Sequence, residues 1–145
     1  MTAKLPVSVL VVVHTASREV LLLERAARAG FWQSVTGSLD RLDEPLEVAA
    51  AREVTEETGI DAGHGRLERW NVVYTFEIYR QWRHRFAPGV VQNVEHLFVL
   101  ELPRAIPVRI APDEHVAFQW LPWQQAAARC FSWSNRDAIV MLGEQ

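Results

Sequence analysis

The chain has 145 residues, of which 49% are hydrophobic, and its formal net charge is −3. This length and apolar content suit one compact domain over residues 1–145, and the weak negative charge excludes a general attraction to nucleic acid or to an anionic membrane. The single cysteine, Cys130, excludes an internal disulfide and fits a reducing compartment.

The first predicted element is a β-strand over residues 7–13, a β-branched run that is typical of a buried strand. This run is too short to cross a bilayer and lacks the basic start and cleavage site of a signal peptide. We therefore expect a cytoplasmic protein without membrane contact and without an obligate protein partner. A turn leads to a paired strand over residues 20–23, and residues 31–37 are predicted to form another short strand.

A central helix follows and is predicted to end at Gly59, because glycine favours the left-handed conformation at a helix end. Pro45 suits the first turn, where its missing N–H would have no partner in any case. Leu46, Ala50 and Val54 give this helix an apolar stripe at i, i+4 and i+8.

Three further strands and two helices are predicted in the second half of the chain. The strands cover residues 70–79, 96–102 and 116–121, with Pro88-Gly89 between the first two, and a short helix covers residues 123–129. A last helix is expected to begin near Ser134, where Ser134 and Asp137 fit a capping box. This order of elements describes a mixed β-sheet sandwiched between helices.

The most informative pattern lies on the central helix, in Arg52-Glu53-Val54-Thr55-Glu56-Glu57-Thr58-Gly59-Ile60. Glu53, Glu56 and Glu57 stand at i, i+3 and i+4, which places their carboxylates on one face. Two interpretations compete: a solvated acidic face, or a metal platform for a phosphorylated substrate. Like charges at this spacing repel, whereas Mg²⁺ takes oxygen ligands from protein and phosphate, so the second interpretation is favoured once the upstream residues are considered.

Gly37 and Glu44 are those upstream residues, and seven residues separate Glu44 from Arg52. The whole pattern resembles the signature of the Nudix hydrolases, Gly-x5-Glu-x7-Arg-Glu-U-x-Glu-Glu-x-Gly-U, in which U is aliphatic. Every position from Glu44 to Ile60 matches. The resemblance implies the Nudix fold, which is an α/β/α sandwich, and the hydrolysis of a diphosphate linked to another group.

One position departs from this signature. Six residues, not five, separate Gly37 from Glu44. Either the loop over residues 38–43 carries one extra residue, or Ser38 replaces the signature glycine. An insertion before the helix would leave the ligand spacing intact.

Segments outside the signature resemble the branch of the family that acts on a pterin triphosphate in folate biosynthesis. These segments are Phe31–Ser38, Arg83–Val90 and Ser132–Arg136. The resemblance implies release of pyrophosphate and formation of the pterin monophosphate. The alternatives are a diphosphatase for nucleoside triphosphates, because purines share the guanine-like edge, and a non-catalytic Nudix module that binds a nucleotide. The intact set of helix carboxylates argues against the non-catalytic module.

The resemblance also implies a metal site. Glu53 and Glu57 would be the primary Mg²⁺ ligands, with Glu56 bound directly or through water, and Mn²⁺ is a possible substitute. Glu114 would complete the metal or base set, although an exposed loop acid is the alternative interpretation. Glu56, Glu57 and Glu114 all remain candidates for the general base.

No serine or cysteine nucleophile pattern is present, so direct attack by water is the simpler mechanism. Arg52 is expected to point to the far side of the helix turn and to hold Glu44, or the loop, by an ion pair. Arg52 and Glu44 are therefore included among the candidate catalytic residues.

The predicted substrate-binding residues have basic, polar, aromatic and aliphatic side chains. They are Lys4, Arg25, Thr36, Phe76, Glu77, Ile78, Tyr79, Ser132 and Trp133. Lys4, Arg25, Arg83 and Arg85 are candidate partners for a triphosphate, with a solvated surface charge as the alternative for each.

The stretch Phe76–Tyr79 offers an aromatic face for a flat ring and a carboxylate acceptor for the amino group of that ring. An ordinary strand with Glu77 facing water is the alternative. His84 and His115 are interpreted as polar or substrate-contacting groups and not as metal ligands, because neither has the i, i+4 partner of a zinc helix.

Overall fold

One mixed β-sheet organises this chain, whose computed structural model describes residues 2–145. The strands are β1 (Val7–Thr15), β2 (Glu19–Arg25), β3 (Trp32–Gln33), β4 (Val35–Ser38), β5 (Arg66–Glu77), β6 (Gln92–Leu102) and β7 (His115–Pro122). The α-helices are α1 (Leu46–Thr58), α2 (Trp123–Arg129) and α3 (Trp133–Gly143), and two short 3₁₀ helices are η1 (Ala62–His64) and η2 (Arg80–Arg85).

Strand β1 is the centre of this sheet, whose main order is β3-β2-β1-β6-β5. It pairs in parallel with β6 along its whole length, from Val7 opposite Val94 to Thr15 opposite Leu102. Its first half pairs on the other side with β4, and its end pairs with β2. Because β1 has neighbours on both sides and helices on both faces, it is apolar almost throughout.

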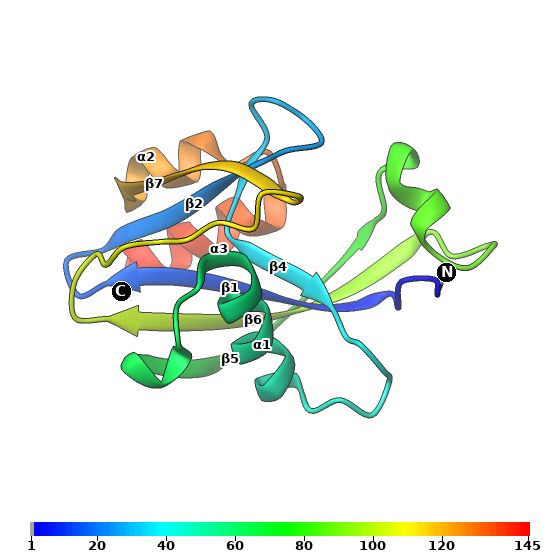
Figure 1. The fold of residues 1–145 in the computed structure, drawn as a ribbon, viewed down its shortest axis with the longest axis horizontal. Helices are drawn as coiled ribbons and strands as arrows, with labels where there is room; N and C mark the ends of the chain where they lie inside the picture. The colour runs from blue at the N-terminus through cyan, green and yellow to red at the C-terminus, as the bar shows by residue number, and fades with distance from the viewer. Residues whose placement is uncertain (1) are drawn as a thin grey trace.

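Helices cover both faces of the sheet (Figure 1). On one face α1 packs over a core that includes Val9 and Phe98. On the other face α2 and α3 pack over a core that includes Leu10 and Leu97. Neighbouring residues of a strand point to opposite faces, so β1, β2 and β6 each contribute side chains to both cores. The predicted mixed sheet sandwiched between helices is confirmed.

The ends of α1 follow simple local rules. Gly59 stands at the C-cap with φ 71, and its N–H donates to the carbonyl of Thr55 at 2.9 Å, as expected for a left-handed glycine cap. Pro45 lies at the N-cap, one position earlier than predicted. Ala50 and Val54 of the predicted apolar stripe are fully buried, and Leu46 packs against the same core.

The predicted strand over residues 31–37 is interrupted at Ser34, which separates β3 from β4. Strand β3 pairs with β2, whereas β4 pairs with β1, so the chain changes partner at this residue. Asn135 of α3 satisfies the backbone there: Ser34 N–H donates to Asn135 Oδ1 at 2.7 Å, and Asn135 Nδ2 donates to Ser34 Oγ at 3.0 Å. No local sequence pattern predicts this contact, because Asn135 lies 101 residues from Ser34 in the chain.

The predicted capping box at Ser134 is wrong. Helix α3 begins at Trp133, and Ser132 is its N-cap, since Ser132 Oγ accepts the N–H of Asn135 at 3.1 Å. Ser134 Oγ instead donates to Glu95 at 2.9 Å. Tertiary contacts therefore use the hydroxyl that the sequence pattern had assigned to the cap.

Strand β5 begins earlier than predicted, at Arg66, and ends at Glu77, so Tyr79 lies beyond it as the residue before η2.

Within residues 2–145, no helix combines the length and apolar character that a membrane crossing requires.

The bridge between Asn135 and Ser34 yields a stability prediction. Asn135→Ala should lower the free energy of unfolding by about 1–3 kcal/mol, because it leaves the buried N–H of Ser34 without an acceptor. Urea unfolding followed by circular dichroism measures this loss. Arg136→Ala, at the next and exposed position of α3, is the control and should change stability by less than about 0.5 kcal/mol. Equal losses in both variants would contradict the role of the bridge.

Candidate active site

Arg52 joins the acidic side chains of α1 to the preceding loop. Its Nε and Nη2 donate to the two carboxylate oxygens of Glu44 at 2.9 and 3.1 Å, and its Nη1 donates to Glu53 at 2.7 Å. The predicted ion pair with Glu44 is confirmed, but the expected direction is wrong, because the same guanidinium also lies 3.2 Å from Glu56. Glu44 is buried, and the hydrogen bonds that it accepts from Arg52 lower its pKa.

Gly37 of β4 lies directly against Glu53. A Cβ atom on Gly37 would stand 2.1 Å from Cδ of Glu53, closer than any real contact. The carboxyl group of Glu53 therefore occupies the space that a side chain at position 37 would fill, so a larger residue there would displace that carboxyl group. This contact identifies Gly37 as the signature glycine, so the additional residue lies in the loop over residues 38–43 and Ser38 is not the replacement.

Two of the three helix carboxylates are buried at this contact. Glu57 is 2% exposed and Glu53 is 8% exposed, while Glu56 is exposed. Burial raises the pKa of Glu57 well above its ordinary range, and the charges of Glu53 and Glu114 raise it further. Burial also raises the pKa of Glu53, against the hydrogen bonds that it accepts.

The start of β7 brings Glu114 and His115 to the same place. Ligand atoms of Glu57, Glu114 and His115 all lie within 4.8 Å of one another. His115 is 3% exposed, and its Nε2 lies 3.8 Å from Oε1 of Glu57. Burial, followed by the charge of Arg25, lowers the pKa of His115 to about 4, so its imidazole is neutral at pH 7.

The sequence interpretation of His115 was a polar or substrate-contacting group and not a metal ligand, whereas the structure places its ring among the candidate ligand atoms. A search for metal ligands on one helix misses it, because it comes from a strand that follows Glu114 at a distant point of the chain. Its place beside a candidate acid, at the start of an apolar strand, was the only local signal.

We name the depression around these side chains the acidic recess: Glu53, Glu56, Glu57, Glu114 and His115 line it. Its donors fit a divalent cation. Oε1 of Glu57 is buried without a hydrogen-bond partner within residues 2–145, and the charges of Glu53 and Glu114 add to burial in raising the pKa of Glu57. A cation bound among them would satisfy that oxygen and remove the repulsion.

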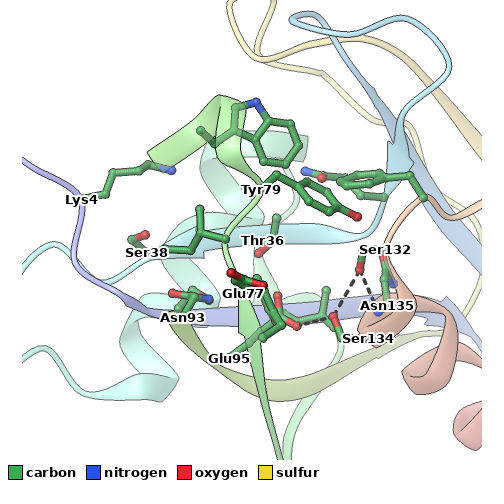
Figure 2. Close-up of a pocket in the computed structure, with 18 of the residues that line it drawn as sticks. Lys4, Thr36, Ser38, Glu77, Tyr79, Asn93, Glu95, Ser132, Ser134 and Asn135 are labelled. Carbon is green, nitrogen blue, oxygen red and sulfur yellow. Dashed lines mark hydrogen bonds between the residues drawn. The ribbon is translucent and has the colours of Figure 1, made fainter. Parts of the chain in front are cut away.

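A second hollow, the aromatic cavity, has a volume of about 180 Å³ and shares lining residues with the recess. Figure 2 shows residues that line this cavity. All nine predicted substrate-binding residues line it: Lys4, Arg25, Thr36, Phe76, Glu77, Ile78, Tyr79, Ser132 and Trp133. Lys4, Arg25 and Arg85 line both hollows, as do Gln33, Thr36, Gly37 and Ser38. The recess and the cavity therefore form one continuous site with basic side chains at the junction.

The four candidate phosphate partners differ in their surroundings. Arg25, the last residue of β2, donates to Gln33 at 3.3 Å, and its guanidinium lies 4.5 Å from the ring centre of Trp82. Burial, and then the charge of Arg85, lower the pKa of Arg25, so an anion at the junction would be favoured. Arg83 instead binds the Glu77 carboxylate at 2.9 Å and lines neither hollow.

Aromatic rings form one wall of the cavity. Tyr79 lies 5.2 Å from Trp82 and 5.9 Å from Phe131 between ring centres. Trp82 and Phe131 were not predicted as site residues, because a lone aromatic near a turn is more often part of the core. Trp133 is 53% exposed and contacts Tyr74 edge-on at 5.6 Å.

Polar side chains from β6 and α3 form the floor of the cavity (Figure 2). Glu95 is 5% exposed and accepts a hydrogen bond from Ser134 at 2.9 Å, and Asn93 is 6% exposed and donates to Ser8 at 2.8 Å. These residues were missed, although two polar residues at i and i+2 of an apolar strand are a recognisable signal. The Glu77 side chain, in contrast, is 72% exposed, as the water-facing alternative described.

Comparison with known proteins agrees with this geometry. A model of the NUDIX domain matches residues 4–141. The chain is 45% identical over 139 residues to a dihydroneopterin triphosphate diphosphatase of Escherichia coli (strain K12), which covers 94% of this chain and 91% of that protein. It is 35% identical over 136 residues to a protein of the same name from Haemophilus influenzae, which covers 91% of this chain and 84% of that one.

The fold comparison gives the same result. The structure of the E. coli dihydroneopterin triphosphate pyrophosphohydrolase superposes with a TM-score of 0.92 at 42% identity, covering 99% of both chains. The matched region contains the signature residues, both hollows and the sheet that carries them. The chain belongs to the Nudix hydrolase family.

Proposed function

We propose that this Nudix hydrolase converts 7,8-dihydroneopterin 3′-triphosphate to dihydroneopterin monophosphate and pyrophosphate. The observation that carries the proposal is the continuity of the acidic recess with the aromatic cavity through Lys4, Arg25 and Arg85. A flat ring in the cavity would extend its phosphate chain across these cations to the carboxylates. Relatives named for this activity match nearly the whole chain, which supports the same substrate.

In the proposed site, Glu53 and Glu57 hold Mg²⁺, with Glu56 and Glu114 completing the set directly or through water. Mn²⁺ can substitute, because octahedral oxygen sites discriminate poorly between these ions. The ion would offset negative charge on the phosphate oxygens and make water more acidic. The buried, unpartnered oxygen of Glu57 supports this assignment.

Glu114 is the carboxylate that we assign to take the proton from the attacking water. Glu56 is engaged by Arg52, which lies 3.2 Å from it, and Glu57 would be committed to the cation. Glu114 lines the recess and is exposed, so water can reach its carboxylate. Arg52 acts as a positioning residue, since it fixes Glu44 and Glu53 together.

Removing one proposed ligand should abolish turnover without loss of fold. Glu57→Gln should lower turnover on the order of a thousandfold at saturating Mg²⁺. A carboxyl group whose pKa is raised in the folded state destabilises that state once the pH exceeds its unfolded-state pKa, and glutamine cannot ionise. The melting temperature of the variant in EDTA at pH 8 should therefore equal or exceed that of the parent protein.

Glu47→Gln is the matched control, because Glu47 is an exposed residue in the first turn of the same helix. It should leave turnover unchanged. Near-normal turnover of Glu57→Gln with Mg²⁺ would show that Glu57 is not a ligand.

The first product identifies the bond that breaks. With dihydroneopterin triphosphate, the proposed reaction releases pyrophosphate in one step, whereas a phosphatase releases orthophosphate. Phosphorus NMR of a reaction without added pyrophosphatase separates the two signals. Orthophosphate as the first product would overturn the proposed activity.

Aromatic residues of the cavity should distinguish a pterin from a purine. Trp133→Ala should lower kcat/KM for the pterin triphosphate by about tenfold to a hundredfold, and lower it less for dGTP. Because Trp133 is 53% exposed, the melting temperature should change little. Phe76→Ala should lower both kcat/KM and the melting temperature, since Phe76 also packs against the core. Equal losses of kcat/KM on both substrates for Trp133→Ala would show that the substrate ring does not bind beside Trp133.

A further inference from the structure

We infer that Glu95 recognises the amino-oxo edge of the ring substrate, accepting hydrogen bonds from the exocyclic amine and from the adjacent ring N–H. This inference deepens the proposed function and rests on it for the identity of the ring. It makes Glu95 a specificity-determining residue, distinct from the carboxylates of the acidic recess.

The first observation is the position of Glu95. Asn93 and Glu95 stand two residues apart on β6, so both side chains point to the same face of the sheet and into the aromatic cavity (Figure 2). That face carries α3, whereas the proposed metal ligands lie on the α1 face. Glu95 therefore cannot belong to the metal set, and the cavity needs another reason for a carboxylate.

The second observation is that burial leaves this carboxylate poorly compensated. Glu95 is 5% exposed, and among the ion pairs of residues 2–145 none includes it. Its Oε1 accepts one hydrogen bond, from Ser134 Oγ at 2.9 Å. A buried carboxylate ordinarily has a cation or several donors. Burial accordingly raises the pKa of Glu95 to about 7.

The amino-oxo edge of the ring supplies the N–H donors that the Glu95 carboxylate lacks. A pterin presents an amine and a ring N–H side by side, and guanine presents the same pair. A carboxylate accepts two parallel N–H bonds from such an edge, whereas an adenine edge has no matching pair of donors. The Asn93 Nδ2 already donates to Ser8, and its Oδ1 is buried without a partner, so it offers one further acceptor on the same floor.

A purely structural role would predict a different pattern. If Glu95 only held the first turn of α3 through Ser134, a glutamine would accept that bond equally well. Glu77 is a poorer candidate for binding the amine, because its carboxylate is already paired with Arg83 and its side chain is 72% exposed to water. The buried position and the free acceptor capacity favour Glu95.

The test uses Glu95→Gln, which keeps the size of the side chain but replaces an acceptor oxygen with an N–H donor. The probe for binding is neopterin, a fluorescent compound that has the edge but no phosphate, with affinity measured in EDTA. We expect its Kd to rise about tenfold or more in the variant. Glu101→Gln is the control, because Glu101 lies on the same strand and the same face but outside both hollows.

A second measurement isolates the amine without assuming a pterin substrate. dGTP and dITP differ only by the exocyclic amine, so the ratio of their kcat/KM values reports its recognition. The parent protein should favour dGTP by about tenfold, and Glu95→Gln should bring this ratio close to one. An unchanged neopterin Kd and an unchanged ratio would overturn the inference, as would equal losses on dGTP and dITP together with a lower melting temperature.

These outcomes separate the inference from the proposed function. If the parent protein fails to hydrolyse dihydroneopterin triphosphate but favours dGTP over dITP only when Glu95 is present, the proposed function fails and the inference stands. If the parent protein and Glu95→Gln hydrolyse the pterin triphosphate with equal kcat/KM, the inference fails and the proposed function stands.

Discussion

The burial of two carboxylates between α1 and β4 is the constraint on which the rest of the site depends. Glu53 and Glu57 are almost fully enclosed, and the carboxyl group of Glu53 occupies the space that a side chain at Gly37 would fill. Enclosure raises the pKa of both carboxyl groups and makes the metal-free arrangement costly. Arg52 offsets part of this cost at Glu53, and a cation would offset the remainder. The two buried carboxylates therefore attract positive charge more strongly than the carboxylates of a solvated helix face would.

The two faces of the central strands β1 and β6 support different parts of the site. Residues of β1 and β6 that point toward α1 complete the core under the acidic recess, and their neighbours, which point toward α3, form the floor of the aromatic cavity. Lys4, Arg25 and Arg85 meet at the end of the sheet where both hollows open. A substrate with a flat ring and a phosphate chain matches this layout, because each part would meet the chemistry that suits it.

Local patterns predicted most of the fold and many of the residues that line the two hollows. The apolar run of β1, the glycine cap of α1 and the bounds of α2 are local properties, and the structure has them where they were expected. The carboxylates of α1 share one face because helix geometry alone puts them there. The missed residues Trp82, Asn93, Glu95 and Phe131 all line the aromatic cavity. They come from η2, from β6 and from the residues before α3, so they are brought together only by the folded chain.

The sequence by itself determined the chemistry of this protein, since the spacing of Glu44, Arg52 and the helix carboxylates depends only on residue type and helical period. Tertiary structure alone decided which glycine the signature uses, where Ser34 breaks a strand, and that Glu95 is buried while Glu77 meets water. Both acids stand on strands with similar neighbours, so no local rule separates them. The packing of α3 on the sheet encloses one and leaves the other in solvent, and packing between distant segments is not encoded in any short stretch of the chain.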